Sequence, residues 1–328
     1  MRRRDFIAIL TGSVAAWPLI ATAQRRADPV IGFLGPQSPN LEFLGKFHQG
    51  LNEWGYFEGR NIAIEYRWAF NQNQQLPALA AELVARRVAL IVTTGGLVAA
   101  KAAREATTTI PILFFGVGID PVESGFLASF NRPGGNATGV SQSYKELIPK
   151  RLELLMQMAP LARKVAYLQN NDITGLGPSE KMQFETETQI AKDLGLVIHF
   201  ARSESDLEAA FAAMAQQQIE ALLVASDPFF GRHGAMIVAL AARYALPAGY
   251  SRREFADAGG LMSYGPSLSE SWQQVGRYAG RILKGARPED LPVRLQDKYE
   301  LVINTTTAEM LGLTCPPLLH ALADEVID

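Results

Sequence analysis

Short apolar runs alternate with amphipathic segments along most of the chain. The run at 29–35 lacks a 3.6-residue period and is bounded by Pro29 and Gly35, which is typical of a strand buried on both faces. The next apolar side chains recur at spacings of three and four and predict an amphipathic helix that ends at Gly55: Leu41, Leu44, Phe47, Leu51 and Trp54. A strand followed by a helix is thus the first unit of the fold.

This unit recurs in two halves of similar size. In the first half we predict strands at 29–35, 61–70, 89–95 and 110–118, with further helices at 75–87 and 97–106. A loop rich in Pro and Gly at 131–139 separates the halves. In the second half we predict helices at 146–158, 179–194, 206–217 and 235–244, and strands at 164–170, 196–202, 219–226 and 246–251. The pattern predicts the α/β class, with two Rossmann-like, doubly wound lobes in tandem.

The predicted sheets also suggest where a ligand binds. Ligands of open parallel sheets lie beyond the carboxyl ends of the strands, where loops and helix N-termini present unpaired N–H groups. Small hydroxyls, amides and two carboxylates dominate these positions, which suits a small polar solute. The candidate ligand-binding residues are Gln37, Ser38, Thr94, Gly95, Gly96, Asp120 and Ser141 in the first half, and Asn170, Ser226, Asp227, Tyr250 and Tyr264 in the second.

Each candidate also has a purely structural interpretation. Thr94 is a possible N-cap of the helix that follows it, and Asp120 and Asp227 each precede a proline, as helix-capping aspartates do. Asn170 is a good turn former. The two candidate tyrosines are of a type more often found half-buried or at interfaces. Capping and ligand contact are compatible, so both interpretations stay open.

The first 23 residues predict a cleavable export signal. Arg2, Arg3 and Arg4 precede an uncharged stretch at 6–20, and an Ala-x-Ala cleavage site ends at Ala23. The paired arginines with the following Phe and Ile also fit the twin-arginine pattern, although general secretion uses basic N-terminal regions too. An uncleaved membrane anchor is the alternative. We expect an exported, periplasmic protein.

Charge and cysteine content narrow the class of protein further. The chain has 31 basic and 33 acidic residues, and removal of 1–23 leaves 28 basic and 32 acidic residues, a net charge of −4. That balance gives no reason to expect nucleic acid or an anionic membrane surface as a partner. Cys315 is the one cysteine, so an intrachain disulfide is impossible and the fold must depend on its apolar core. After the signal, no stretch approaches the ~18 consecutive apolar residues of a transmembrane helix.

The residues do not predict catalysis. Ser141 lacks the second glycine of a nucleophile elbow, and Pro121 stands where a dinucleotide-binding loop has its third glycine. The four histidines do not lie at metal-ligand spacings or beside a plausible nucleophile: His48, His199, His233 and His320. We therefore expect no catalytic residue, no metal and no cofactor.

Four segments carry a resemblance to a known family: 50–69, 110–141, 276–293 and 299–313. Their most specific elements are Asp-Pro-Val at 120–122, Arg-Pro-Gly-Gly-Asn-Ala-Thr-Gly at 132–139, and Val-Ile-Asn with its following Ala and Gly-Leu at 302–313. Together they resemble the ABC-transporter substrate-binding protein family related to the tryptophan-type binding proteins, over about Pro29 to Leu313. The resemblance implies a periplasmic-binding-protein fold of type I, in which two lobes joined by a three-stranded hinge close over a small solute.

Two positions depart from the family pattern. Thr93-Thr94 stands where members often have Ala-Thr, and Gly118-Ile119 stands where a shorter turn commonly precedes Asp120. These departures do not change the expected fold. They leave the identity of the ligand undetermined, because the family binds aromatic amino acids and other small organic solutes.

The resemblance also implies where the lobes connect. We expect crossings near 139–143, 250–253 and 265–266, which assigns 24–142 and 266–292 to lobe I and 143–265 to lobe II. The segment 293–328 is expected to pack against lobe II and the hinge. Three crossings restrict the lobes to bending about one axis, so that closure buries the solute between them.

For an amino-acid-like ligand, the amides near 94–96 would hold the carboxylate, and Asp120 or Asp227 would pair with the ammonium. Serine hydroxyls would complete the polar shell, and Tyr250, Tyr264 or Phe229 would cover the side chain. The implied partners are a small-molecule ligand and an ABC permease with its ATPase, and we expect a monomer. A sensor for a membrane receptor and an exported α/β enzyme are the alternatives.

Overall fold

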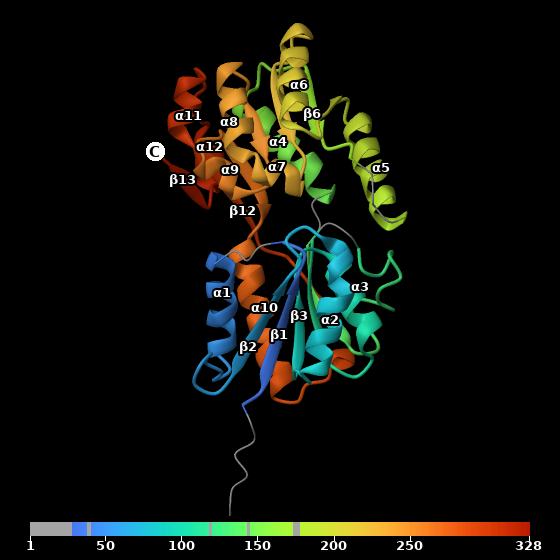
Figure 1. Ribbon diagram of the computed structural model, residues 1–328. Coiled ribbons are helices and arrows are strands. Elements are labelled where there is room, and N and C mark those ends of the chain that lie inside the picture. The colour runs from blue at the N-terminus through green and yellow to red at the C-terminus, as the bar shows by residue number, and fades with distance from the viewer. Residues whose placement is uncertain (1–27, 38–40, 118–119, 143–144, 173–177) are drawn as a thin grey trace, which may run out of the picture.

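The computed structural model describes residues 28–37, 41–117, 120–142, 145–172 and 178–328, and these form two lobes, one above the other in Figure 1. The predicted export signal, Ser38 and Gly118-Ile119 lie outside the described residues. A six-stranded sheet in the order β11-β5-β4-β3-β1-β2 organises lobe I, and a seven-stranded sheet in the order β13-β12-β10-β9-β8-β6-β7 organises lobe II. The predicted α/β class with two doubly wound lobes is confirmed.

Lobe I is built on an all-parallel sheet with helices on both faces. Its elements are β1 (Val30–Gly35), α1 (Leu41–Asn52), β2 (Ala63–Trp68), η1 (Asn73–Gln75), α2 (Leu76–Ala85), β3 (Leu90–Thr93), α3 (Leu97–Ala106), β4 (Ile112–Val117), β5 (Ala137–Gln142), α10 (Leu268–Leu283), η3 (Pro288–Asp290) and β11 (Arg294–Leu295).

Alternation along β1 divides the core of lobe I into two layers. Ile31 and Phe33 pack in the layer that contains α1 and α10, whereas Leu34 packs in the layer with α2 and α3. Both faces of the strand are therefore covered, which is why its sequence is a continuous apolar run. Glycines let α1 and α10 approach closely, because a Cβ on Gly50 would overlap the backbone of α10 and a Cβ on Gly276 the backbone of α1.

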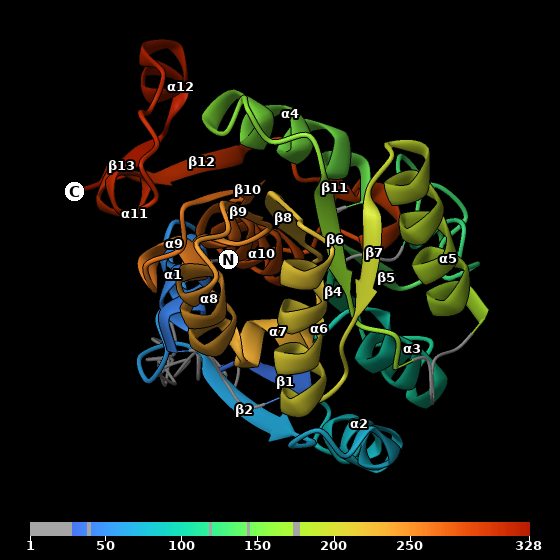
Figure 2. The same ribbon diagram turned by 90° about the horizontal axis from the view of Figure 1, so that it is seen from above.

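Lobe II has a largely parallel sheet with one antiparallel pair, β10 and β12. Figure 2 shows α4 and α5 on one side of this sheet and α6 and α8 on the other. Its elements are η2 (Lys145–Leu147), α4 (Ile148–Met158), β6 (Val165–Gln169), α5 (Pro178–Asp193), β7 (Val197–Phe200), α6 (Glu204–Gln216), β8 (Ala221–Val224), α7 (Pro228–Arg232), α8 (Gly234–Arg243), β9 (Ala248–Tyr250), α9 (Arg253–Asp257), β10 (Met262–Pro266), β12 (Tyr299–Asn304), α11 (Thr305–Met310), α12 (Pro317–Leu322) and β13 (Glu325–Ile327).

The chain passes between the lobes after β5, between β10 and α10, and between β11 and β12. The crossing predicted near 250–253 is wrong, because β9 and β10 pair in parallel and the intervening α9 stays in lobe II. The crossing that replaces it lies at 296–298. Its neighbour β11 has two residues, too few to produce a hydrophobic pattern in the sequence.

Hydrogen bonds tie the three crossings to one another. Gln142 Nε2 donates to Ser271 Oγ at 2.6 Å, and the Ser267 amide donates to the Lys298 carbonyl at 3.1 Å. The side-chain amide of Gln296 donates to the same carbonyl at 3.0 Å. The connecting segments thus form one polar layer between the two apolar cores.

One predicted loop is in part a strand. Residues 137–139 belong to β5, which lies between β4 and β11. Gly139 passes so close to Phe114 that a Cβ there would overlap the Phe114 carbonyl. Gly139, one of the residues that suggested a loop, is therefore required by this close approach.

Candidate ligand-binding site

The strand ends of lobe I face lobe II, and α7, which follows β8, lies on the side of lobe II nearest to lobe I (Figure 1). We call these two surfaces the interlobe faces. The face of lobe I includes Gly35, Gln37, Trp68, 94–96 and Asp120; the face of lobe II includes Lys145, Asn170, Ser226 and Asp227. The predicted site residues of each half therefore gather largely at one end of their lobe.

Gly35 brings two side chains of the lobe I face together. It is the last residue of β1 and pairs in register with Trp68, the last residue of β2. A Cβ on Gly35 would overlap the Trp68 indole and lie 2.5 Å from Thr94 Oγ1. The hydroxyl and the indole ring consequently occupy the space that any larger residue at 35 would need.

The amino end of α3 presents backbone donors beside this hydroxyl. Gly95 and Gly96 adopt φ values of 73° and 81°, which favour glycine. Gly96 is the N-cap and no side chain caps the helix, so the interpretation of Thr94 as the N-cap is wrong. The first-turn amides of α3 thus keep a partial positive charge toward the interlobe side.

Asp120 closes a turn with one oxygen of its carboxylate. Oδ1 accepts hydrogen bonds from the amides of Val122 at 2.7 Å and Glu123 at 3.1 Å. The segment at 121–125 that follows is a turn, so the interpretation of Asp120 as a helix cap is wrong. Oδ2 has no hydrogen-bond partner among the residues that the structure describes.

Asp227 has the same arrangement on lobe II. Its Oδ1 accepts from the Phe229 amide at 2.7 Å, which caps α7, and from Asn170 Nδ2 at 3.1 Å. Asn170 also forms the expected turn, since its Oδ1 accepts from the Asp172 amide at 2.9 Å. Within the described part of the chain, Asp227 Oδ2 is again left without a partner. The two carboxylates are therefore held rigidly with one oxygen each still able to accept.

A buried charged cluster lies near Asp227. Glu187 of α5 is 8 % exposed, and burial raises the pKa of its carboxyl group above the ordinary value of 4.5. Gln183 donates to Glu187 Oε1 at 3.1 Å, while Arg151 and Lys145 oppose the rise electrostatically and Asp227 adds to it. The lobe II face thus combines carboxylates with cations.

Lys145 connects the two faces. Its Nζ lies 3.5 Å from Glu123 Oε2, and its side chain is 18 % exposed whereas that of Glu123 is 57 % exposed. Glu123 belongs to the loop after β4 in lobe I, and Lys145 opens lobe II. This ion pair therefore spans the first crossing.

The remaining predicted site residues differ in accessibility. Gln37 is exposed, and Ser226 and Tyr264 are partly exposed. Ser141 lies within β5 and is 4 % exposed, so it does not follow a strand as expected. Tyr250 is 1 % exposed and stacks on Phe255 with ring centroids 4.7 Å apart, which places it in the core of lobe II. Ser141 and Tyr250 are therefore not on the interlobe faces.

Sequence reasoning missed Trp68 and Lys145. Trp68 continues the alternation of Ile64 and Tyr66 on one face of β2, but the predicted strand ran to Phe70 and hid its position at the strand end. Lys145 follows a crossing and belongs to no periodic pattern. An aromatic residue at a strand end is the signal that would have found Trp68.

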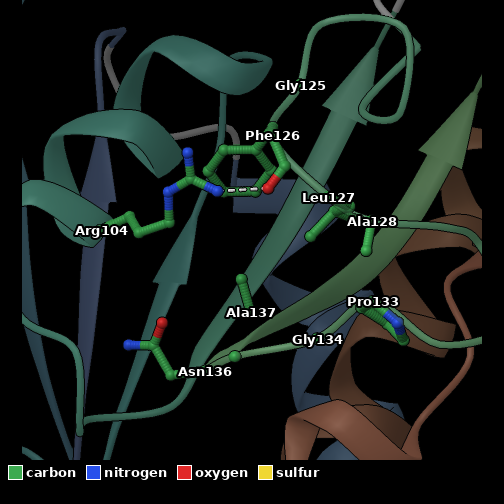
Figure 3. A pocket seen from close by; sticks show the side chains of 10 residues that line it. Arg104, Gly125, Phe126, Leu127, Ala128, Pro133, Gly134, Asn136 and Ala137 are labelled. Carbon is green, nitrogen blue, oxygen red and sulfur yellow. Dashed lines mark hydrogen bonds between the residues drawn. The ribbon is translucent and has the colours of Figure 1, made fainter.

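A pocket of about 380 Å³ lies elsewhere on lobe I, beside the amino end of β5 (Figure 3). The Arg104 guanidinium covers the Phe126 ring and donates to the Phe126 carbonyl. The pocket contains none of the predicted site residues.

Within the described ranges there is no cluster of His, Cys, Asp and Glu able to hold a metal, and no helix long and apolar enough to cross a membrane.

Comparison with known proteins identifies the family. Residues 37–327 match the family model described as ABC transporter substrate binding protein. The chain belongs to this family. It is accordingly a substrate-binding protein and not an enzyme, as predicted.

Relatives agree with this assignment. A tyrosine-binding protein from Clostridioides difficile (strain R20291) is 28 % identical over 280 residues, covering 84 % of this chain and 79 % of the relative. The structure of a Streptococcus pneumoniae domain in complex with L-Trp matches with a TM-score of 0.77 at 24 % identity, covering 92 % of this chain and all of the other. The ligand-free, open structure of a Clostridium difficile substrate-binding protein with adhesive properties matches with a TM-score of 0.70 at 22 % identity, covering 91 % of this chain and 99 % of the other. At these identities the two structures establish the fold alone.

Proposed function

We propose that the protein is exported, captures an amino acid between its lobes and delivers it to an ABC permease with its ATPase. The observation that carries this proposal is the complementary chemistry of the two faces. Backbone donors with a hydroxyl lie on lobe I, and a rigid carboxylate with a spare oxygen lies on lobe II. A zwitterionic amino acid needs hydrogen-bond donors for its carboxylate and a negatively charged acceptor for its ammonium.

The carboxylate of the ligand binds to lobe I. The uncapped amides at the amino end of α3 and the Thr94 hydroxyl are suited to an anion, since the helix dipole adds to the hydrogen bonds. Gly95 and Gly96 add no side chain of their own beside these amides, and the Pro36 ring lies against Gly95. Gln37 extends the polar surface on the same face.

The ammonium of the ligand binds to Asp227 on lobe II. Asp120 has equivalent hydrogen bonds but lies on the same lobe as the carboxylate site. A ligand held by Thr94 and Asp227 touches both lobes and therefore favours the closed form by its differential affinity. Asn170, Ser226 and Tyr264 complete the surroundings of the ligand.

An aromatic side chain fits the relative named as a tyrosine-binding protein and the similar structure in complex with L-Trp. The predicted export signal and the family support a periplasmic location, where we expect a monomer to present its closed form to the permease. The protein itself needs no cofactor for this task.

Native mass spectrometry of the protein purified without added solute tests the proposal, followed by calorimetric titration against the twenty amino acids. We expect a bound amino acid that is released on denaturation, and tight binding of at least one aromatic member of the panel. Absence of binding by every amino acid would overturn the proposal.

A further inference from the structure

Trp68 stands out on the lobe I face because it is a large apolar side chain beside the proposed carboxylate site. It is partly buried on β2, the edge strand of the sheet, where it packs against the core together with Ile64 and Tyr66. Its ring and Thr94 Oγ1 share the space next to the Cα of Gly35. A group bound by the Thr94 hydroxyl therefore lies next to the indole.

Neighbouring rings fix the orientation of Trp68. Tyr66 stacks on it with centroids 6.0 Å apart and an interplanar angle of 17°, and Phe33 lies 6.2 Å away on β1. Phe33 in turn stacks on Trp272 of α10 at 6.3 Å. Because aromatic side chains in such a row have little freedom, the indole is held in place before any ligand arrives.

We propose that Trp68 determines the specificity of the site, by forming the wall on which the planar side chain of the ligand packs while Thr94 binds its carboxylate. This inference rests on the proposed amino-acid-binding function and assigns a residue to its side-chain pocket. The absence of a side chain at Gly35 is what permits the two groups to be adjacent.

The physical basis is a stacking preference between rings. Two aromatic groups in contact attract each other beyond their buried area, whereas an aliphatic side chain gains only the area term. Removal of the indole should therefore weaken binding of aromatic amino acids more than binding of aliphatic ones. We expect a loss of roughly two- to tenfold in the ratio of the two affinities.

The test compares Trp68→Ala and Trp68→Phe with the matched control Trp54→Ala. Trp54 lies in the same lobe, follows the carboxyl end of α1 and is 37 % exposed, so it reports the effect of losing an indole remote from the interlobe face. Affinities for tryptophan, tyrosine and leucine are measured by calorimetry, and circular dichroism with thermal melting verifies folding. Trp68→Phe keeps a ring at this position and serves if Trp68→Ala does not fold.

The inference predicts that Trp68→Ala loses the aromatic preference, that Trp68→Phe retains most of it, and that Trp54→Ala leaves it unchanged. An unchanged affinity ratio in folded Trp68→Ala would overturn the inference and leave amino-acid binding intact. If Trp68→Ala does not fold, Trp68→Leu takes its place, and an affinity ratio in Trp68→Phe equal to that in Trp68→Leu would overturn the inference instead. Wild-type protein that binds only aliphatic amino acids would also overturn it, whereas wild-type protein that binds none would overturn the proposed function.

Discussion

The two interlobe faces are built from the same kind of strand-end loop but carry different chemistry. Lobe I offers backbone amides, the Thr94 hydroxyl and the indole of Trp68 in addition to the carboxylate of Asp120, with no side chain capping α3. Lobe II offers carboxylates, each already engaged in hydrogen bonds with its own lobe, together with nearby cations. The difference suggests a division of labour, in which lobe I recognises the carboxylate and ring and lobe II recognises the positive charge.

The largest expected effect on ligand affinity comes from removing the negative charge of Asp227 on the lobe II face. Asp227→Asn keeps an oxygen that can cap α7 but no longer pairs with an ammonium. Hydrogen bonds to charged groups contribute about 1.5–3 kcal/mol, so calorimetry should show a loss of affinity of roughly 10- to 100-fold.

Asp120→Asn is the matched control for this change, because its oxygen caps a turn in the same way on the other lobe. We expect its affinity to stay within about threefold of wild type, which is under 1 kcal/mol. If Asp120→Asn loses affinity and Asp227→Asn does not, then both ends of the zwitterion bind to lobe I and the proposed division of labour is wrong.

The two faces also differ in how far the sequence could predict them. Positions 94–96 were correctly placed before a helix because the helix at 97–106 has a clear period and ends as predicted. The proximity of Trp68 to Thr94 depends on the register of β1 with β2 and on the close approach at Gly35, neither of which a single sequence reveals. The local sequence pattern thus located the backbone donors at 94–96 but not the indole ring of Trp68 beside them.

Long-range contacts limited the prediction of lobe II in the same way. Asp227 was recognised as a possible helix cap and Asn170 as a turn former, yet their mutual hydrogen bond depends on β6 and β8 being neighbours although β7 lies between them in sequence. Tyr250 was expected beyond a strand end and instead packs in the core, because the ring of Phe255 covers it. Strand order decided the contact between Asn170 and Asp227, and a single sequence does not reveal strand order.

A second difference between the lobes concerns the pH dependence of folding stability, because the buried Glu187 belongs to lobe II. Its pKa is raised by burial, so the folded protein binds this proton more strongly than the unfolded chain does. Stability from this group is therefore greatest at low pH, and it falls as the pH rises from about 4.5 through the folded-state pKa. Arg151 and Lys145 moderate the effect, whereas Asp227 and the burial strengthen it.

Glu187→Gln removes the titration while leaving an oxygen for the amide of Gln183. Urea unfolding at a series of pH values should show the variant gaining stability relative to wild type as the pH rises above 4.5. Glu185→Gln on the same helix, where the side chain is exposed, is the control and should show no such trend. A difference between Glu187→Gln and wild type that does not vary with pH would mean that Glu187 titrates alike in both states.

The smallest expected effect concerns the ion pair that joins the two faces. Lys145 and Glu123 are 3.5 Å apart, and Glu123 is more than half exposed, so the pair contributes at most about 1 kcal/mol and is screened by salt. If the pair favours the arrangement of lobes seen here, Glu123→Gln should ease closure and raise the ligand affinity by less than about fivefold at low salt. The gain should vanish in concentrated salt, where wild type and variant should bind alike. A lowered affinity would mean instead that the pair persists or strengthens when the lobes close, which would make it part of the closed form.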